Sequence, residues 1–103
     1  MVRRLPKREH FYLKYTIWER DGHTCQSPLL PPICQGKPFI TLADCDMDHI
    51  QAGRYGSNDY ANLRILCPVC HALRDDGYHI QLLLELLESN RMPSGWHLHK
   101  WEG

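Results

Sequence analysis

Hydrophobic positions recur at helical spacing in two segments of the chain. In residues 6–21, the apolar side chains between Phe11 and Trp18 can share one helix face, and Pro6 suits a helix start. Residues 78–91 show the clearest helical pattern. The face expected to be buried there comprises Ile80, Leu83, Leu84 and Leu87. The pattern therefore predicts one helix near each end of the chain.

The middle of the chain has the pattern of a hairpin followed by a short helix. Residues 39–50 are β-prone at their start and predict the first strand, residues 51–62 predict a loop, and the apolar residues 63–67 predict the second strand. Pro68 then opens a helix expected to run to about Asp75. The tail, residues 96–101, alternates and predicts a strand or a clamp over the core. Together these elements predict an α+β fold in one domain covering residues 1–103.

The size and composition of the chain favour a domain that is stabilised by a bound structural metal. A chain of 103 residues buries a limited core, and a structural metal often supplies the missing stability. No apolar run approaches the length of a membrane span, and the basic start lacks the apolar stretch of a secretory signal. We therefore expect a cytoplasmic protein, in which thiols stay reduced and clustered cysteines more often bind metal than form disulfides.

Five cysteines suggest a zinc site. The spacing of Cys67 and Cys70 matches the bite of tetrahedral zinc. Cys25, Cys34 and Cys45 compete to supply the other two thiolates. Cys25 and Cys34 are preferred, because they bracket a Pro- and Gly-rich loop that has no other means of order, whereas Cys45 sits in the expected strand. The alternatives are that Cys45 replaces either of them, or that all five are small buried hydrophobes.

Carboxylates and imidazoles suggest a second metal site. Asp44, Asp46 and Asp48 alternate along the expected strand, and His49 follows at once. Asp44 and Asp46 are interpreted as a solvated acidic turn. Asp48 with His71 makes a reasonable ligand set for a catalytic divalent ion, and a histidine beside that ion but not bound to it can act as a general base.

The charge is unevenly distributed although the formal net charge is zero. The first 20 residues carry six basic and two acidic side chains. Such a segment can be a phosphate-binding arm or simply a solvated helix face. The residues assigned to the arm, which we place at positions 1–8, are Arg3, Arg4, Lys7 and Arg8.

An ordered set of motifs resembles the HNH nucleases of the ββα-metal class. It consists of Asp48-His49-Ile50, a glycine-containing loop at 53–59, the segment from Asn62 through Cys67-Pro-Val-Cys70-His71, and Arg74. The lead-in, residues 20–25, also resembles that of the family, so the motif core covers residues 20–75. The chain resembles the four-cysteine zinc subgroup and small HNH proteins of phages and mobile elements.

The resemblance implies a role for each motif residue. His49 would activate the attacking water, Asp48 and His71 would bind the catalytic ion, and Asn62 would brace the loop and so orient the histidine. The structural zinc would be held by Cys25, Cys34, Cys67 and Cys70.

The chain departs from the family pattern at two places. The first cysteine pair is separated by eight residues where two are usual. Asp75 stands where some relatives carry a further histidine, so it is either a third ligand or a helix-surface carboxylate. The remaining histidines have no partner visible in the sequence and receive no role.

The function implied is that of a metal-dependent DNA endonuclease that leaves 5′-phosphate and 3′-hydroxyl ends. The exchangeable ion would be Mg²⁺, Mn²⁺, Ni²⁺ or Zn²⁺, and Arg64 and Arg74 are candidate phosphate contacts. Little sequence preference is expected, because 103 residues leave no room for a second recognition domain. The alternatives are a non-catalytic zinc-knuckle module that binds nucleic acid or protein, and a phage assembly or packaging factor with accessory nuclease activity. The expected partners are DNA, phage packaging proteins, or a second copy bound through helix 78–91.

Overall fold

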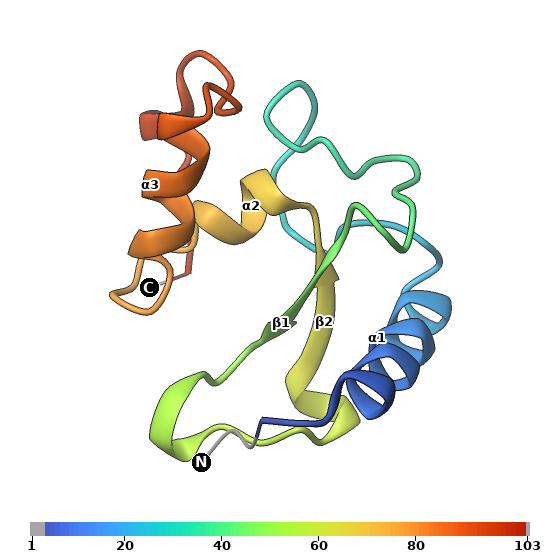
Figure 1. Ribbon diagram of the computed structural model, residues 1–103. Helices are drawn as coiled ribbons and strands as arrows, with labels where there is room; N and C mark the ends of the chain where they lie inside the picture. The colour runs from blue at the N-terminus through green and yellow to red at the C-terminus, as the bar shows by residue number, and fades with distance from the viewer. Residues whose placement is uncertain (1–3, 103) are drawn as a thin grey trace.

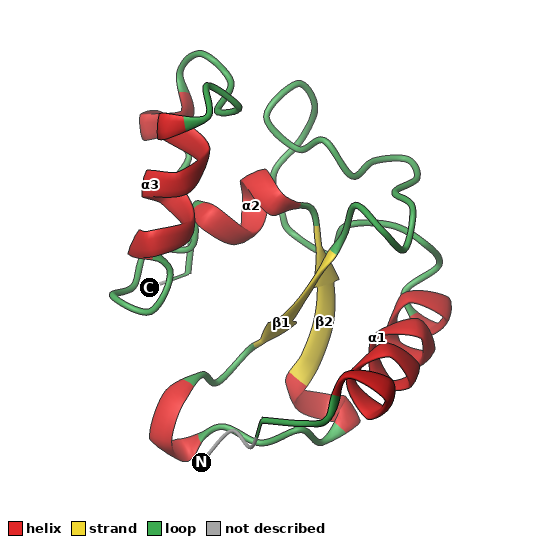
Figure 2. Ribbon diagram, viewed as in Figure 1, coloured by secondary structure: helices red, strands yellow, loops and turns green. Residues whose placement is uncertain are grey.

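The computed structural model describes residues 4–102, so Arg3 lies outside the described residues. Within the described residues, three α-helices surround one hairpin (Figure 1). The helices are α1 (Lys7–Arg20), α2 (Pro68–Ala72) and α3 (Ile80–Glu88), and the hairpin consists of the antiparallel strands β1 (Asp46–His49) and β2 (Leu63–Leu66). Short 3₁₀ turns lie at Gly53–Tyr55, Tyr60–Asn62 and Trp96–Leu98. Figure 2 shows the hairpin between α1 on one side and α2 with α3 on the other, which confirms the expected α+β fold.

Strand β1 is shorter than the sequence predicts. In the register Asp48 pairs with Arg64 and His49 with Leu63. The strand prediction for residues 39–45 is wrong: Thr41 Oγ1 donates to Asp44 Oδ2 at 2.7 Å, and the backbone NH groups of Asp44 and Cys45 both donate to the Thr41 carbonyl. Side-chain hydrogen bonds of this local kind compete with strand pairing, so Cys45 lies in a turn before β1.

Helix α1 is fastened to the hairpin at its C-terminal end. Arg20 donates to the carbonyls of Tyr60 at 2.7 Å and of Leu63. The carboxylate of Asp21 accepts from the backbone NH of Ile65 at 2.9 Å. These contacts hold the C-terminal end of the helix against β2.

Helix α3 buries a different face from the one predicted. Leu83 and Leu86 are buried, whereas three of the predicted positions are exposed. Those three are Ile80, Leu84 and Leu87. The reason lies just before the helix, where the buried His79 bonds to Asp76 and sets the rotation of α3, so that positions 79, 83 and 86 point inward.

The C-terminal tail closes over the core. Trp101 is buried, donates its indole NH to the Cys70 carbonyl at 2.8 Å, and exchanges backbone hydrogen bonds with Leu73 and Asp75. Within the described residues, no helix has the length and apolar character needed to cross a bilayer.

Candidate metal and catalytic sites

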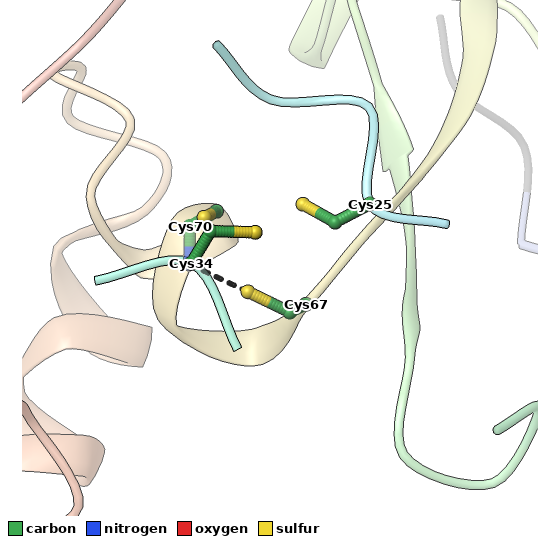
Figure 3. Close-up of side chains that lie close together, drawn as sticks. All are labelled: Cys25, Cys34, Cys67 and Cys70. Atoms are coloured by element: carbon green, nitrogen blue, oxygen red, sulfur yellow. Dashed lines mark hydrogen bonds between the residues drawn. The ribbon is translucent and has the colours of Figure 1, made fainter. Parts of the chain in front are cut away.

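Four cysteine thiols gather where the irregular loop meets the start of α2. Cys67 and Cys70 come from the N-terminal turn of α2, and Cys25 and Cys34 from the loop that they bracket. Figure 3 shows the four side chains pointing toward one another, and their Sγ atoms all lie within 4.8 Å of one another. This is the set that the sequence favours. Cys45 lies apart, with its thiol against the Leu42 carbonyl at 3.3 Å.

The surroundings of the thiols suit a cation. Hydrogen bonds from Cys67 and Cys70 lower the pKa of Cys25, and the same contact raises the pKa of Cys67 to about 11. The negative charge of one thiolate therefore disfavours ionisation of the next thiol, unless a bound positive ion compensates the charges. Gly36 lies so close that a Cβ there would stand 2.8 Å from the Cβ of Cys25. Four buried thiolates in a tight cradle fit structural zinc, which favours tetrahedral sulfur ligands.

A second cluster joins one carboxylate and two imidazoles. Asp48 on β1 is fully buried, His71 lies on α2, and His79 immediately precedes α3. Asp48 Oδ1 lies 3.3 Å from His71 Nε2 and 3.4 Å from His79 Nε2. The three side chains thus converge on one point, where they could hold a metal ion.

Outer carboxylates aim both histidines at that point. His71 Nδ1 bonds to Asp46 Oδ2 at 2.9 Å, and His79 Nδ1 bonds to Asp76 Oδ1. Metal-binding histidines commonly donate the other ring NH to a carboxylate, which fixes the tautomer and the ring orientation. Asp46 therefore contacts the site, where the sequence suggested a solvated turn.

Two arginine side chains donate hydrogen bonds to the carboxylate of Asp48. Arg64 Nε donates to Asp48 Oδ2 at 2.8 Å, and Arg74 Nη1 donates to Asp48 Oδ1 at 3.0 Å. Arg74 also donates to the backbone carbonyls of His49 and Ile50. Their side chains are 12% and 7% exposed, so the structure turns both inward, where the sequence suggested phosphate contacts.

The charge of this network suits a divalent cation. Four carboxylates, those of Asp46, Asp48, Asp76 and Glu102, contact the two histidines and two arginines. With neutral imidazoles the network carries two excess negative charges. Burial lowers the pKa of His71, but hydrogen bonds to Asp46 and Asp48 outweigh it and raise that pKa to about 9. A bound ion would displace the proton and supply the missing positive charge.

His49 stands beside the cluster on the surface of the hairpin. Its Nε2 lies 2.8 Å from Asn58 Oδ1 in the loop between β1 and β2. An imidazole that donates Nε2–H to this oxygen keeps Nδ1 as its proton acceptor. Asn62 ties the two ends of the loop, since its amide bonds to both backbone groups of Gln51 and to the Ser57 carbonyl.

Sequence reasoning missed His79 and considered Asp75 in its place. The side chain of Asp75 is 69% exposed and faces Lys100 at 3.8 Å, away from the cluster. Helix α2 ends at Ala72, so counting along a helix from His71 does not identify His79 as its neighbour. A weak signal was present in the Asp76-x-x-His79 spacing, which suits the observed carboxylate–imidazole bond.

Comparison with known proteins gives one result. Residues 32–77 match the family model described as HNH endonuclease, whereas no curated protein and no solved structure gives a significant match. The matched segment contains the hairpin, α2, Asp48, His49 and His71, and it ends just before His79. Three of the four clustered cysteines, Cys34, Cys67 and Cys70, lie within this segment, and the cluster is consistent with the zinc-binding subgroup of the family. Residues 32–77 are therefore similar to the HNH endonucleases, a similarity that indicates nuclease activity in general.

Proposed function

We propose that this protein is a metal-dependent DNA endonuclease, with the ion held by Asp48, His71 and His79. The observation that carries the proposal is a cavity of about 380 Å³ lined by these three residues and by His49. A general base and a ligand set thus face the same space, which suits hydrolysis of a phosphodiester. A zinc-knuckle module that only binds nucleic acid gives no reason to bury a carboxylate with two imidazoles.

The chain's own groups divide the reaction between them. His49 Nδ1 takes a proton from water as the water oxygen attacks phosphorus, and the bond from phosphorus to the 3′ oxygen breaks. A divalent ion, when bound, stabilises the charge that develops on the phosphate and on the leaving oxygen. Asn58 orients His49, and Arg64 with Arg74 holds Asp48 in place. The 3′ oxygen gains a proton from solvent, leaving 5′-phosphate and 3′-hydroxyl ends.

The direct test is incubation of supercoiled plasmid with the zinc-loaded protein and added Mg²⁺, Mn²⁺, Ni²⁺ or Zn²⁺. We expect nicked and then linear DNA with at least one ion, and 5′ ends that accept radiolabel only after phosphatase treatment. Sequencing the ends should show little sequence preference, because the HNH unit directs its side chains at the backbone. A folded, zinc-loaded protein that cuts with none of the four ions would overturn the proposal.

His79 gives a sharper prediction about the ion. His79→Ala should weaken binding of Mn²⁺ at least roughly 100-fold, since even outer-sphere partners of metal ligands are worth 10–100-fold. Asp75→Ala is the matched control, because the sequence leaves open whether Asp75 is a third ligand or a helix-surface carboxylate, and its side chain is 69% exposed. Calorimetric titration of zinc-loaded protein measures both. Equal affinities for the two variants would exclude His79 from the ligand set.

A further inference from the structure

A second and larger cavity lies on the other side of His49. It measures about 530 Å³, and its lining includes Met47 and His49, which also line the cavity of the metal cluster. The N-terminal segment contributes Arg4, Leu5, Lys7 and His10 to the lining, and the three basic side chains among them are called the basic wall. The general base therefore separates two spaces, one with the ligands of a cation and the other with basic groups.

The basic wall is built from the segment before α1 and from the first turn of that helix. Lys7 and His10 are three residues apart and so share a helix face, whereas Arg8 points elsewhere and does not line the cavity. Among the described residues that line it, none is acidic. In Figure 1 this segment runs beside the loop between β1 and β2, whose Asn58 also lines the cavity.

Helix α1, which carries Lys7 and His10, is attached to the hairpin that carries His49. Arg20 and Asp21 fasten the far end of α1 to β2, the strand that pairs with β1. Met47 and His49 belong to β1 itself. Because Lys7 and His10 lie on a helix that packs against the hairpin, a ligand that binds them needs to order less of the protein than one that binds an unattached segment.

We propose that this cavity binds the backbone phosphates of the DNA strand next to the scissile phosphate, with Arg4, Lys7 and His10 as the contacts. The inference rests on the proposed function and deepens it, because it gives the strand a path from the metal cluster past His49 to the basic wall. Cationic and NH-donating side chains around a cavity without carboxylates suit a phosphodiester chain. The segment at residues 4–10 is then part of the active-site groove, and its loss moves the scissile phosphate relative to His49.

A matched pair of substitutions tests the proposal. Lys7→Ala and Arg8→Ala each remove one exposed positive charge from neighbouring positions of α1, but only Lys7 lines the cavity. We expect Lys7→Ala to weaken binding of a fluorescein-labelled duplex on the order of tenfold, as lost charged hydrogen bonds do. It should also lower the slope of log affinity against log salt by about one. Arg8→Ala should change both quantities little.

Binding is measured by fluorescence anisotropy without added divalent ion, so the result does not depend on cleavage. His10→Ala and His97→Ala form a second pair, since both histidines are exposed and His97 does not line the cavity. Thermal unfolding checks that all four variants remain folded. Larger losses for Lys7→Ala and His10→Ala than for their controls support the groove whether or not the plasmid is cut. Equal losses within each pair would show a diffuse basic arm and overturn the inference.

Discussion

Cys70→Ser is expected to leave the protein unfolded, whereas Cys45→Ser should leave it folded. Both thiols are buried, so the two substitutions are matched in burial and in chemistry. They differ in place: Cys70 belongs to the four-thiol cluster, and Cys45 contacts a backbone carbonyl. Structural zinc supplies about 10–16 kcal/mol in zinc-finger peptides, while small domains are stable by about 5–15 kcal/mol. Loss of one zinc ligand therefore removes most of the stability of a domain this small.

The measurements are elemental analysis of purified protein and far-ultraviolet circular dichroism during heating. Wild type and Cys45→Ser should each carry one zinc per chain and melt cooperatively. Cys70→Ser should carry little zinc and show no cooperative transition. A Cys70→Ser variant that melts like wild type would show that the cluster is not a folding element.

Much of the fold follows from local patterns in the sequence. Strand β2 and the start of α2 were predictable because an apolar run ends at a Cys-Pro step, and Pro at the first helical position fixes the helix start. The turn before β1 was not, because the hydrogen bonds between Thr41 and Asp44 override a β-prone sequence. The inward face of α3 was not predictable either, because it depends on His79, a polar residue that hydrophobic patterns ignore.

The candidate site shows the same division. Residues that lie close together in the sequence could be recognised from it, and these are the pair Cys67 and Cys70 and the pair Asp48 and His49. His79 joins the cluster across a helix end and a turn, so its place depends on packing alone. The inward turn of Arg74 has a similar origin. Its guanidinium bonds to Asp48 and to the backbone carbonyls of His49 and Ile50, which lie 24 to 26 residues away in the sequence.

The proposed mechanism predicts that His49→Ala slows cleavage by roughly 10²–10⁴-fold, the usual contribution of a general base. The imidazole of His49 lies outside the metal cluster, and its Nε2 is hydrogen-bonded to Asn58 in the loop. Its loss should therefore leave the zinc content, the melting temperature and the Mn²⁺ affinity close to those of wild type.

Comparing His49→Ala with His71→Ala distinguishes the role of a general base from that of a metal ligand. Both variants should lose activity, but His71→Ala should do so by failing to bind the exchangeable ion, since His71 Nε2 faces Asp48 Oδ1. High Mn²⁺ concentration should thus restore part of the activity of His71→Ala and none of that of His49→Ala. Single-turnover cleavage rates across a Mn²⁺ titration measure the difference. His49→Ala protein that cuts DNA at the wild-type rate would remove His49 from the chemistry, and a rescue of His49→Ala by Mn²⁺ would make it a ligand instead of a base.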